Sequence, residues 1–444
     1  MAMNKKLLTI RKYALENQNN NNSSRREVHL TKNKHLDVFI FLFFGAVLVA
    51  SIFIILNIFG VFTKVDSYYA LKATVEDGIS YDNELTCVLH FKGNASSVNS
   101  EKNEITKKYT AALKGIHLRA DAVNAHKQSA SIALINQNIG KATYVDQEVY
   151  AMLQEAYAIS NIDDNNYSIF ASPLYEHWLN LCSFAKLGNL DSDPLINEDE
   201  RNYLNELTSI INDANNYSIE FLEDNRIKVD ISETYQAFID KYELDTPIIS
   251  LNVLENVFKI EAAKKVLVEN GYTDGYITTR NGLGLTLEGL ESLAHSIFNV
   301  SKPEGEIGYI NYSKPHVFKK TMMYEYLNAN EYQYYQITGS DSVTHYRNIN
   351  LNLKTGYPNE QYLATYMISE ELTLKDMCLA NQRLMLVDSL EKETDFINNN
   401  KNIEVCLNRL ETPNSYFLTK NVKELIYLFN SEVYYIDNIN REEN

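Results

Sequence analysis

One long apolar segment near the N-terminus constrains this chain more than any other feature. Residues 38–62 carry no charge and are mostly Phe, Leu, Ile and Val, interrupted only by Gly45, Ser51, Asn57 and Gly60. A helix of that length, rising about 1.5 Å per residue, exceeds the roughly 30 Å hydrocarbon core of a bilayer. A cleaved signal peptide has a shorter apolar core. The sequence therefore predicts one transmembrane helix that the mature protein retains.

The residues on either side of this segment predict its orientation. Residues 1–37 contain eight Lys and Arg against three Asp and Glu, which gives a charge of +5, and only Lys64 lies just beyond the apolar segment. Because cytoplasmic flanks carry the excess of Lys and Arg, we expect the N-terminus in the cytoplasm and the main domain outside it. The polar tract 17–24 has nothing to bury, so we expect the tail to be disordered.

The charge and the cysteines of the remaining chain exclude some classes of function. The whole chain carries −17, so the part beyond the basic tail carries about −22. Such a field repels phosphate backbones, and we therefore expect no nucleic-acid partner. The cysteines are far apart and form no CxxC pair, so neither a zinc site nor a disulfide framework is indicated. The sequence is compatible with one or two disulfide bonds if the domain lies outside the cell, but it does not assign the pairs. The four cysteines are Cys87, Cys182, Cys378 and Cys406.

Helical and strand patterns alternate along the outer part of the chain. Residues 81–90 alternate well enough for a strand, and residues 276–279 read as another. Gly271 is a good C-terminal cap for a helix that precedes it. The sequence predicts a mixed α+β fold. Apolar residues recur at helical spacing in three segments: 105–116, 149–159 and 260–267.

Two polar segments, residues 161–168 and 191–203, predict surface insertions. The second begins with Asp191 and Asp193 in alternation, as a calcium-binding loop does. Its sixth and twelfth positions lack the Gly and the Glu that such a loop needs, so we interpret the segment as a solvated acidic loop.

The glycines at 282 and 284 resemble part of a dinucleotide fingerprint. Leu287 stands at the third glycine position, where a bulky side chain would hold the helix away from the phosphates. We interpret the segment as a turn between a strand and a helix. The apolar residues that predict this helix are Leu290, Leu293 and Ile297.

Three motifs occur in a fixed order in the last third of the chain. The first ends in Thr338-Gly339-Ser340, the second is Thr355-Gly356-Tyr357-Pro358, and the third contains Asp376. This order resembles the FAD:protein FMN transferases, the ApbE family. Those enzymes carry a Ser-Gly element, a His-x-x-Asp-Pro-x-Thr-Gly-x-Pro loop and an Ala-Asp-x-x-x-Thr helix that binds magnesium. Residues 131–136 and 172–178 are similar to two further segments of that family.

The resemblance implies a fold, two cofactors and a site. It spans about residues 81–430 and implies an ApbE-like domain there, with FAD and Mg²⁺ as cofactors. Asp376 is the implied metal ligand. The implied FAD contacts are Thr338, Gly339, Ser340, Thr355 and Gly356. The predicted organisation is a tail (1–37), a transmembrane helix (38–62), a stalk (63–80), the ApbE-like domain (81–430) and a C-terminal tail (431–444).

Most residues that carry the family's chemistry are replaced. Ile349 and Asn352 stand where the family has His and Asp, and His345 lies four residues too early. Ala380 replaces the metal-binding Thr. The Gly-Gly-x-Ala-Lys-Gly segment falls on residues 252–257, which contain neither glycine nor lysine.

Asp376 therefore has two interpretations. A carboxylate suits Mg²⁺, which usually needs more than one protein oxygen together with substrate phosphates. Thr373 precedes Asp376 at the spacing of a capping box, so Asp376 is equally suited to capping a helix that begins at Leu374. One residue can fill both roles.

Two hypotheses for function follow from the resemblance. One is an active Mg²⁺-dependent transferase that attaches FMN to an extracytoplasmic protein. The other is a degenerate, non-catalytic relative that serves a membrane flavoprotein system as a binding or scaffolding subunit. The sequence favours the second, because side chains now stand where glycines would let the backbone approach a phosphate.

Overall fold

The computed structural model describes residues 46–55, 63–76, 79–82, 85–161, 166–279, 282–290, 296–299, 308–312, 320–326, 333–412, 415–419, 426–428 and 435–439. The chain divides into two compact units, Met1–Thr63 and Lys64–Asn444. Residues 46–55, inside the apolar segment, are helical; the predicted tail 1–37 and the rest of the segment lie outside the described residues. Among described helices, none combines the length and apolar character needed to cross a bilayer.

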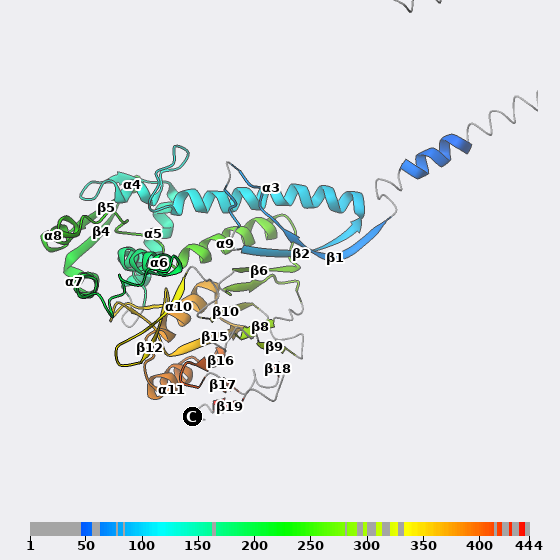
Figure 1. Ribbon diagram of the computed structural model, residues 1–444. Helices are drawn as coiled ribbons and strands as arrows, with labels where there is room; N and C mark the ends of the chain where they lie inside the picture. Colours follow the sequence, from blue (N-terminus) through cyan, green and yellow to red (C-terminus); the bar gives the residue numbers. More distant parts are fainter. Residues whose placement is uncertain are drawn as a thin grey trace, which may run out of the picture. The chain divides into compact units, whose positions relative to one another are not determined.

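The second unit is built on a nine-stranded sheet (Figure 1). Neighbouring strands are antiparallel except the last pair, which is parallel. Mostly antiparallel strands combined with helices give the α+β class that the sequence predicts. In sheet order the strands are β1 (Lys64–Leu71), β2 (Leu85–Asn94), β6 (Gly275–Thr279), β7 (Gly284–Thr286), β10 (Thr321–Tyr326), β15 (Tyr362–Ser369), β16 (Glu404–Arg409), β17 (Ser415–Thr419) and β19 (Tyr435–Ile439).

A layer of helices packs on this sheet. Helix α3 contacts β1, β2 and α9; α9 contacts β6 and α10; and α10 contacts β10 and β15. The helix order thus follows the strand order, which brings the start of α9 beside α10. The helices are α3 (Ala95–Ala120), α9 (Leu254–Glu269), α10 (Leu374–Leu384) and, later in the chain, α11 (Leu390–Asn399).

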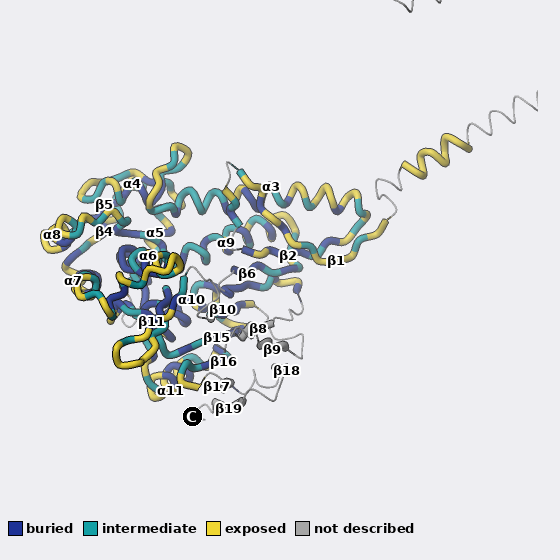
Figure 2. The backbone as a smooth tube through the Cα atoms, viewed as in Figure 1, coloured by how far each residue is buried: buried dark blue, intermediate teal, exposed yellow. Residues whose placement is uncertain are grey.

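A second, mainly helical region lies in the sequence between α3 and α9. It contains a small sheet in the order β3-β5-β4, and its core includes the fully buried Trp178 of α6. Figure 2 shows dark, buried backbone in α6 and where this region meets α10. Its elements are α4 (Ile132–Asn136), β3 (Thr143–Tyr144), α5 (Gln147–Ser160), η1 (Ile169–Ala171), α6 (Ser172–Lys186), α7 (Glu198–Asn212), η2 (Ala214–Asn216), β4 (Tyr217–Leu222), β5 (Arg226–Ile231) and α8 (Glu233–Tyr242).

Three small sheets complete the described part of the chain. Two are hairpins that carry predicted site residues, and the first of them packs against α6. The hairpins are β11 (Tyr334–Thr338) with β12 (Thr344–Asn348), and β13 (Leu351–Asn352) with β14 (Tyr357–Pro358). The third sheet, in the order β18-β9-β8, contains Ile426–Leu428, Gly308–Tyr312 and Ser296–Asn299.

Several predicted elements are confirmed because their apolar residues face the core. Helix α3 buries residues at helical spacing, among them Ile105, Tyr109 and Leu113. Helices α5 and α9 and strand β6 also lie where expected. The chain leaves α9 through Gly271 at φ +84°, and the amide of the next residue, Tyr272, donates to the carbonyl of Leu267 (3.0 Å).

The prediction of a helix after Gly282 is wrong. Gly284–Thr286 forms β7 and Ser296–Asn299 forms β8; residues 291–295 lie outside the described part. Gly282, at φ +82°, turns β6 back into β7. A Cβ there would lie 2.1 Å from the carbonyl oxygen of Tyr324, so the glycine serves a close strand approach.

The predicted domain limits also shift. The expected stalk, residues 63–80, contains β1, whose Leu71 is buried, and the folded unit begins at Lys64. Strand β2 begins at Leu85, later than expected from the alternation. In the expected tail 431–444, Tyr435–Ile439 forms β19 and pairs with β17. The four cysteines are free and buried.

Candidate functional site

Thr338, Gly339 and Ser340 lie at a hairpin turn. Thr338 ends β11, and the amide of Gly339 donates to the carbonyl of Val343 (2.8 Å). Ser342, at φ +66°, donates its amide back to the carbonyl of Gly339 (3.0 Å). The polar backbone groups of this turn therefore close the hairpin on itself.

Thr355 and Gly356 form the turn of the second hairpin. Both amides donate to the carbonyl of Asn352, at 3.2 and 2.8 Å. The carbonyl of Gly356 accepts a hydrogen bond from Nε1 of Trp178 (2.8 Å). Gly356 lies at φ +76°, and a Cβ there would be 1.9 Å from Oγ1 of Thr208 on α7. Glycine is thus required for packing against α7, whether or not a ligand binds.

Replacing Gly356 by alanine is expected to destabilise the protein by about 2 to 4 kcal/mol, because the left-handed conformation and the overpacking each carry a cost. Gly188→Ala is the matched control, since Gly188 has φ +83° and nothing within 4 Å of the added Cβ. It should show only the backbone cost. Urea unfolding of residues 64–444 measures both variants, and equal losses of stability would show that Thr208 does not restrict position 356.

Asp376 caps helix α10. Its amide donates to Oγ1 of Thr373 (3.1 Å), and its Oδ2 accepts from the amide of Thr373 (3.4 Å), which completes a capping box. Ala380, one turn later, is buried and offers no ligand atom. Within the described residues, no group of three or more His, Cys, Asp or Glu side chains is placed to hold a metal. The capping interpretation is confirmed, and the metal-binding role of Asp376 stays a prediction.

A thermal melt separates the two roles of Asp376. As a cap, Asp376→Ala should cost about 1 kcal/mol with or without Mg²⁺. A metal that binds only the folded state would raise the melting temperature of the wild type and not of the variant. We expect millimolar Mg²⁺ to leave both melting temperatures unchanged. A rise confined to the wild type would show that the carboxylate binds the metal.

The start of α9 does not offer a free anion site. Residues 252–257 correspond to the family's glycine-rich segment, and here Asn252 adopts φ +49°. The amides of Leu254 and Glu255 donate to the carbonyls of Leu251 and Asn252, both at 3.1 Å. Glu255 also places a carboxylate in the first turn of the helix. Amides that would bind a phosphate at this terminus are therefore occupied, and the local charge is unfavourable.

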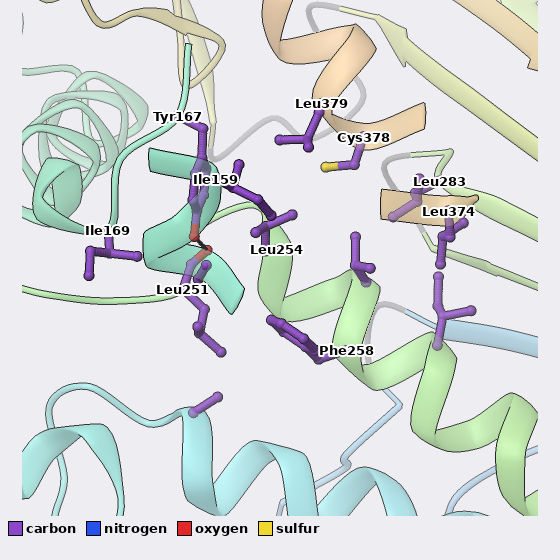
Figure 3. Close-up of a cluster of buried hydrophobic side chains, with 14 of the residues drawn as sticks. Ile159, Tyr167, Ile169, Leu251, Leu254, Phe258, Leu283, Leu374, Cys378 and Leu379 are labelled. Carbon is purple, nitrogen blue, oxygen red and sulfur yellow. Dashed lines mark hydrogen bonds between the residues drawn. The ribbon is translucent and has the colours of Figure 1, made fainter. Parts of the chain in front are cut away.

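Buried apolar side chains at the starts of α9 and α10 belong to one cluster, which also includes Ile159, Tyr167 and Ile169 (Figure 3). We define the α9–α10 junction by Leu254 and Phe258 on α9 and Leu374 and Cys378 on α10, all of which are buried. Sγ of Cys378 lies 3.9 Å from the carbonyl oxygen of Val253. Burial, together with the Glu325 carboxylate, raises the pKa of Cys378 to about 12. The resemblance places a glycine-rich segment at the start of α9 and a metal ligand at the start of α10, and the buried apolar residues of the junction offer no ligand atom for a phosphate or for Mg²⁺.

The second motif instead borders an open groove of about 420 Å³. One part of the lining is apolar and comes from Pro194, Leu195, Tyr357 and Pro358. The other part is charged and comes from Arg201, His345, Arg347 and Glu360. Both the volume and the combination of apolar and polar groups are typical of small-molecule sites.

A buried ion network holds this groove. Nε of Arg347 donates to Oδ2 of Asp193 (3.1 Å), and Nη1 donates to Oε1 of Glu360 (2.7 Å). The hydroxyl of Tyr335 also donates to Asp193 (2.6 Å). Nδ1 of His345 lies 3.1 Å from the other oxygen of Glu360. The side chain of Asp193 is 1% exposed, so its assignment to a solvated acidic loop is wrong. Arg347, which compensates the charge of Asp193, lies in β12, far along the chain from Asp193.

Asn136 and Asn166 bond to backbone groups of segments far away in the chain. Nδ2 of Asn136 donates to the carbonyl of Ile249 (2.9 Å), while its Oδ1 accepts the amide of the same residue (3.0 Å). Asn166 bonds the backbone of the second hairpin at Leu351 (2.6 Å) and Leu353 (2.8 Å). Asn136 thus holds the segment that leads into α9, and Asn166 holds the hairpin that carries Gly356.

Comparison with known proteins relates this architecture to one group of solved structures. No family model and no curated protein matches the chain. The ApbE protein of Thermotoga maritima matches with a TM-score of 0.53 at 14% identity, over 80% of this chain and 98% of its own. The flavin transferase ApbE of Vibrio cholerae matches with a TM-score of 0.48 at 12% identity, over 82% and 97%. The first match shows that the chain has an ApbE-like fold.

Proposed function

We propose that this protein is a non-catalytic relative of the ApbE flavin transferases, anchored in the membrane by residues 38–62. In this proposal the ApbE-like unit lies outside the cytoplasm and acts as a binding or scaffolding subunit, with an extracytoplasmic flavoprotein as its partner. The single observation that supports loss of catalysis most strongly is the apolar α9–α10 junction. Its residues Leu254, Leu374 and Cys378 are apolar and buried, at the starts of the two helices where the resemblance places the glycine-rich segment and the metal ligand.

The environment of the second motif supports the same proposal. Asn352, at the position of the family's Asp, accepts the amide of Lys354 on its Oδ1 (3.0 Å) and so serves the turn. Ile349, at the position of the family's His, has no group that exchanges a proton. A phosphoryl transfer needs a neutralised pyrophosphate and a base for the attacking hydroxyl. Neither requirement is met by the residues at these positions.

The test is whether the protein carries a flavin. We expect the full-length protein, purified in detergent, to show no flavin absorbance, and we expect dialysis against FAD and Mg²⁺ to leave none bound. Stoichiometric FAD that depends on Mg²⁺, and that is lost in Asp376→Ala, would show that the cofactor still binds through Asp376 and would remove the structural argument for lost catalysis.

An active Mg²⁺-dependent FAD:protein FMN transferase is the alternative. The observation in its favour is the ApbE-like fold, together with the exposed position of Asp376 at the start of α10, where a metal has access. FMN transfer to an acceptor protein distinguishes this alternative from the proposal, because binding alone produces no covalent product.

Protease protection tests the proposed anchor. Protease added outside intact cells should remove residues beyond the apolar segment and leave a small basic fragment in the membrane, because the excess of Lys and Arg predicts a cytoplasmic tail. Mass spectrometry of the membrane fraction identifies that fragment. Recovery of an intact soluble form that begins after Phe62 would show that the segment is cleaved.

A further inference from the structure

We propose that the groove beside Tyr357 binds a small organic anion, with a phosphate or carboxylate head on Arg201 and an apolar body against Leu195, Tyr357 and Pro358. The inference is independent of the question of flavin transfer. It follows from the charge, the rigidity and the position of the groove.

Arg201 supplies the charge. Its Nε donates to the carbonyl of Pro194 (2.8 Å) and its Nη2 to that of Leu195 (2.9 Å), so the guanidinium is held without being neutralised. Within the described part of the chain, no carboxylate lies within ion-pair distance of it. Its remaining N–H groups stay available on the groove wall, where a phosphate or carboxylate can accept them.

The other charged groups of the groove are paired with one another. Glu360 would repel an anion, but one of its oxygens accepts from Arg347 and the other faces His345. Arg347 pairs with both Glu360 and the buried Asp193, so its guanidinium is occupied by carboxylates. Arg201 is therefore the arginine of the lining whose free N–H groups can take an anion.

The ring of Tyr357 connects the apolar and the charged parts of the groove. The guanidinium carbon of Arg347 lies 5.8 Å from its centroid, and the ring of Trp178 lies 5.9 Å away. Burial raises the pKa of the Tyr357 hydroxyl, and the charges of Arg347 and Arg201 oppose that rise. The charges of both arginines thus lower the pKa of the same hydroxyl at the groove wall. Trp178 lies beside this wall, so its fluorescence can report a ligand bound there.

The groove borders the second motif but is separate from the metal position that the resemblance implies at Asp376. Asn359, between Pro358 and Glu360, donates Nδ2 to the carbonyls of Met385 (2.9 Å) and Val387 (3.2 Å), just beyond the C-terminal end of α10. Asp376 lies at the other end of the same helix. At about 1.5 Å per residue the two ends are separated by more than 10 Å.

Fluorescence of Trp178, the single tryptophan of the chain, tests the proposal. Full-length protein in detergent is titrated with phenyl phosphate, with benzoate and with the neutral benzyl alcohol. We expect a saturable change with at least one of the two anions, and the tighter of them identifies the preferred head group. Arg201→Gln should weaken binding about tenfold or more, because a charged hydrogen bond is lost. Arg226→Gln, which removes an exposed arginine of β5, should leave binding unchanged.

Three results would overturn the proposal. They are the absence of a saturable change with either anion up to about 10 mM, which corresponds to negligible affinity; equal binding by wild type and Arg201→Gln; and binding of benzyl alcohol as tight as that of the anions. If Arg201→Gln lowers the melting temperature, Arg201→Lys is used in place of that variant. Lysine keeps the positive charge but lacks the planar array of N–H donors of the guanidinium. Binding by Arg201→Lys should then be weaker than wild type, and unchanged binding would count against the proposal.

Discussion

The full-length protein, incubated with FAD, Mg²⁺ and a flavinylation-competent acceptor domain, is expected to leave the mass of the acceptor unchanged. The general base is missing at Ile349, and losing such a group typically costs about 10² to 10⁴ in rate. Loss of electrostatic stabilisation of the transferred group costs about a further 10² to 10³. The segment 252–257, which the resemblance matches to the family's glycine-rich segment, also contains no glycine. Together these losses place transfer below detection by mass spectrometry.

An active FAD:protein FMN transferase, added to the same acceptor, is the positive control for this assay. The inactive control is Asp376→Ala of the present protein, which should behave like the wild type. A gain of one FMN by the acceptor that disappears in Asp376→Ala would contradict the expectation and establish the enzyme.

Asp193→Ala is expected to lose about 1 to 3 kcal/mol of stability, because Nε of the buried Arg347 loses its acceptor and only Glu360 remains to pair with the guanidinium. The side chain of Arg347 is only 5% exposed, so water cannot replace the lost carboxylate. The variant also removes the acceptor of the Tyr335 hydroxyl. Chemical denaturation of residues 64–444 measures the loss.

Asp191→Ala is the matched control for this substitution. Asp191 lies two residues earlier, is exposed, and forms no ion pair within the described part of the chain. Its replacement should change stability by less than about 0.5 kcal/mol. Similar losses for the two variants would mean that the loop as a whole, and not the Asp193–Arg347 pair, determines the effect.

Local patterns in the sequence were sufficient to predict some elements. Helices α3, α5 and α9 have apolar residues at a spacing of three and four because one face packs on the sheet or on a neighbouring helix. The cap at Gly271 and the capping box at Thr373 depend on residues only a few positions apart. The order of three short motifs was sufficient to predict the ApbE-like fold, which the Thermotoga maritima structure shares.

Features that depend on distant residues were not predictable in the same way. Asp193 and Arg347 are 154 positions apart, and nothing near either residue indicates the partner. Asp193 therefore looked like one acid among several in a polar loop. Strands β1 and β19 form the two opposite edges of the sheet, where β1 pairs with β2 and β19 pairs with β17. These pairings depend on tertiary contacts that a short alternating pattern does not specify. Ile297 lies in β8, but its spacing from Leu290 and Leu293 also fits a helix. A short series of apolar residues does not distinguish the helical period from the strand period.

The reactivity of Cys378 toward a thiol reagent tests the central claim, a closed apolar α9–α10 junction, most directly. Burial raises the pKa of all four thiols to about 12, which keeps them protonated near pH 8, and the packing also excludes the reagent. We predict that none of the four cysteines is modified in the native protein, and that all four react after unfolding. Rapid modification of Cys378 in the native protein, slowed by added FAD, would contradict the account, because it would show an open pocket that a flavin enters.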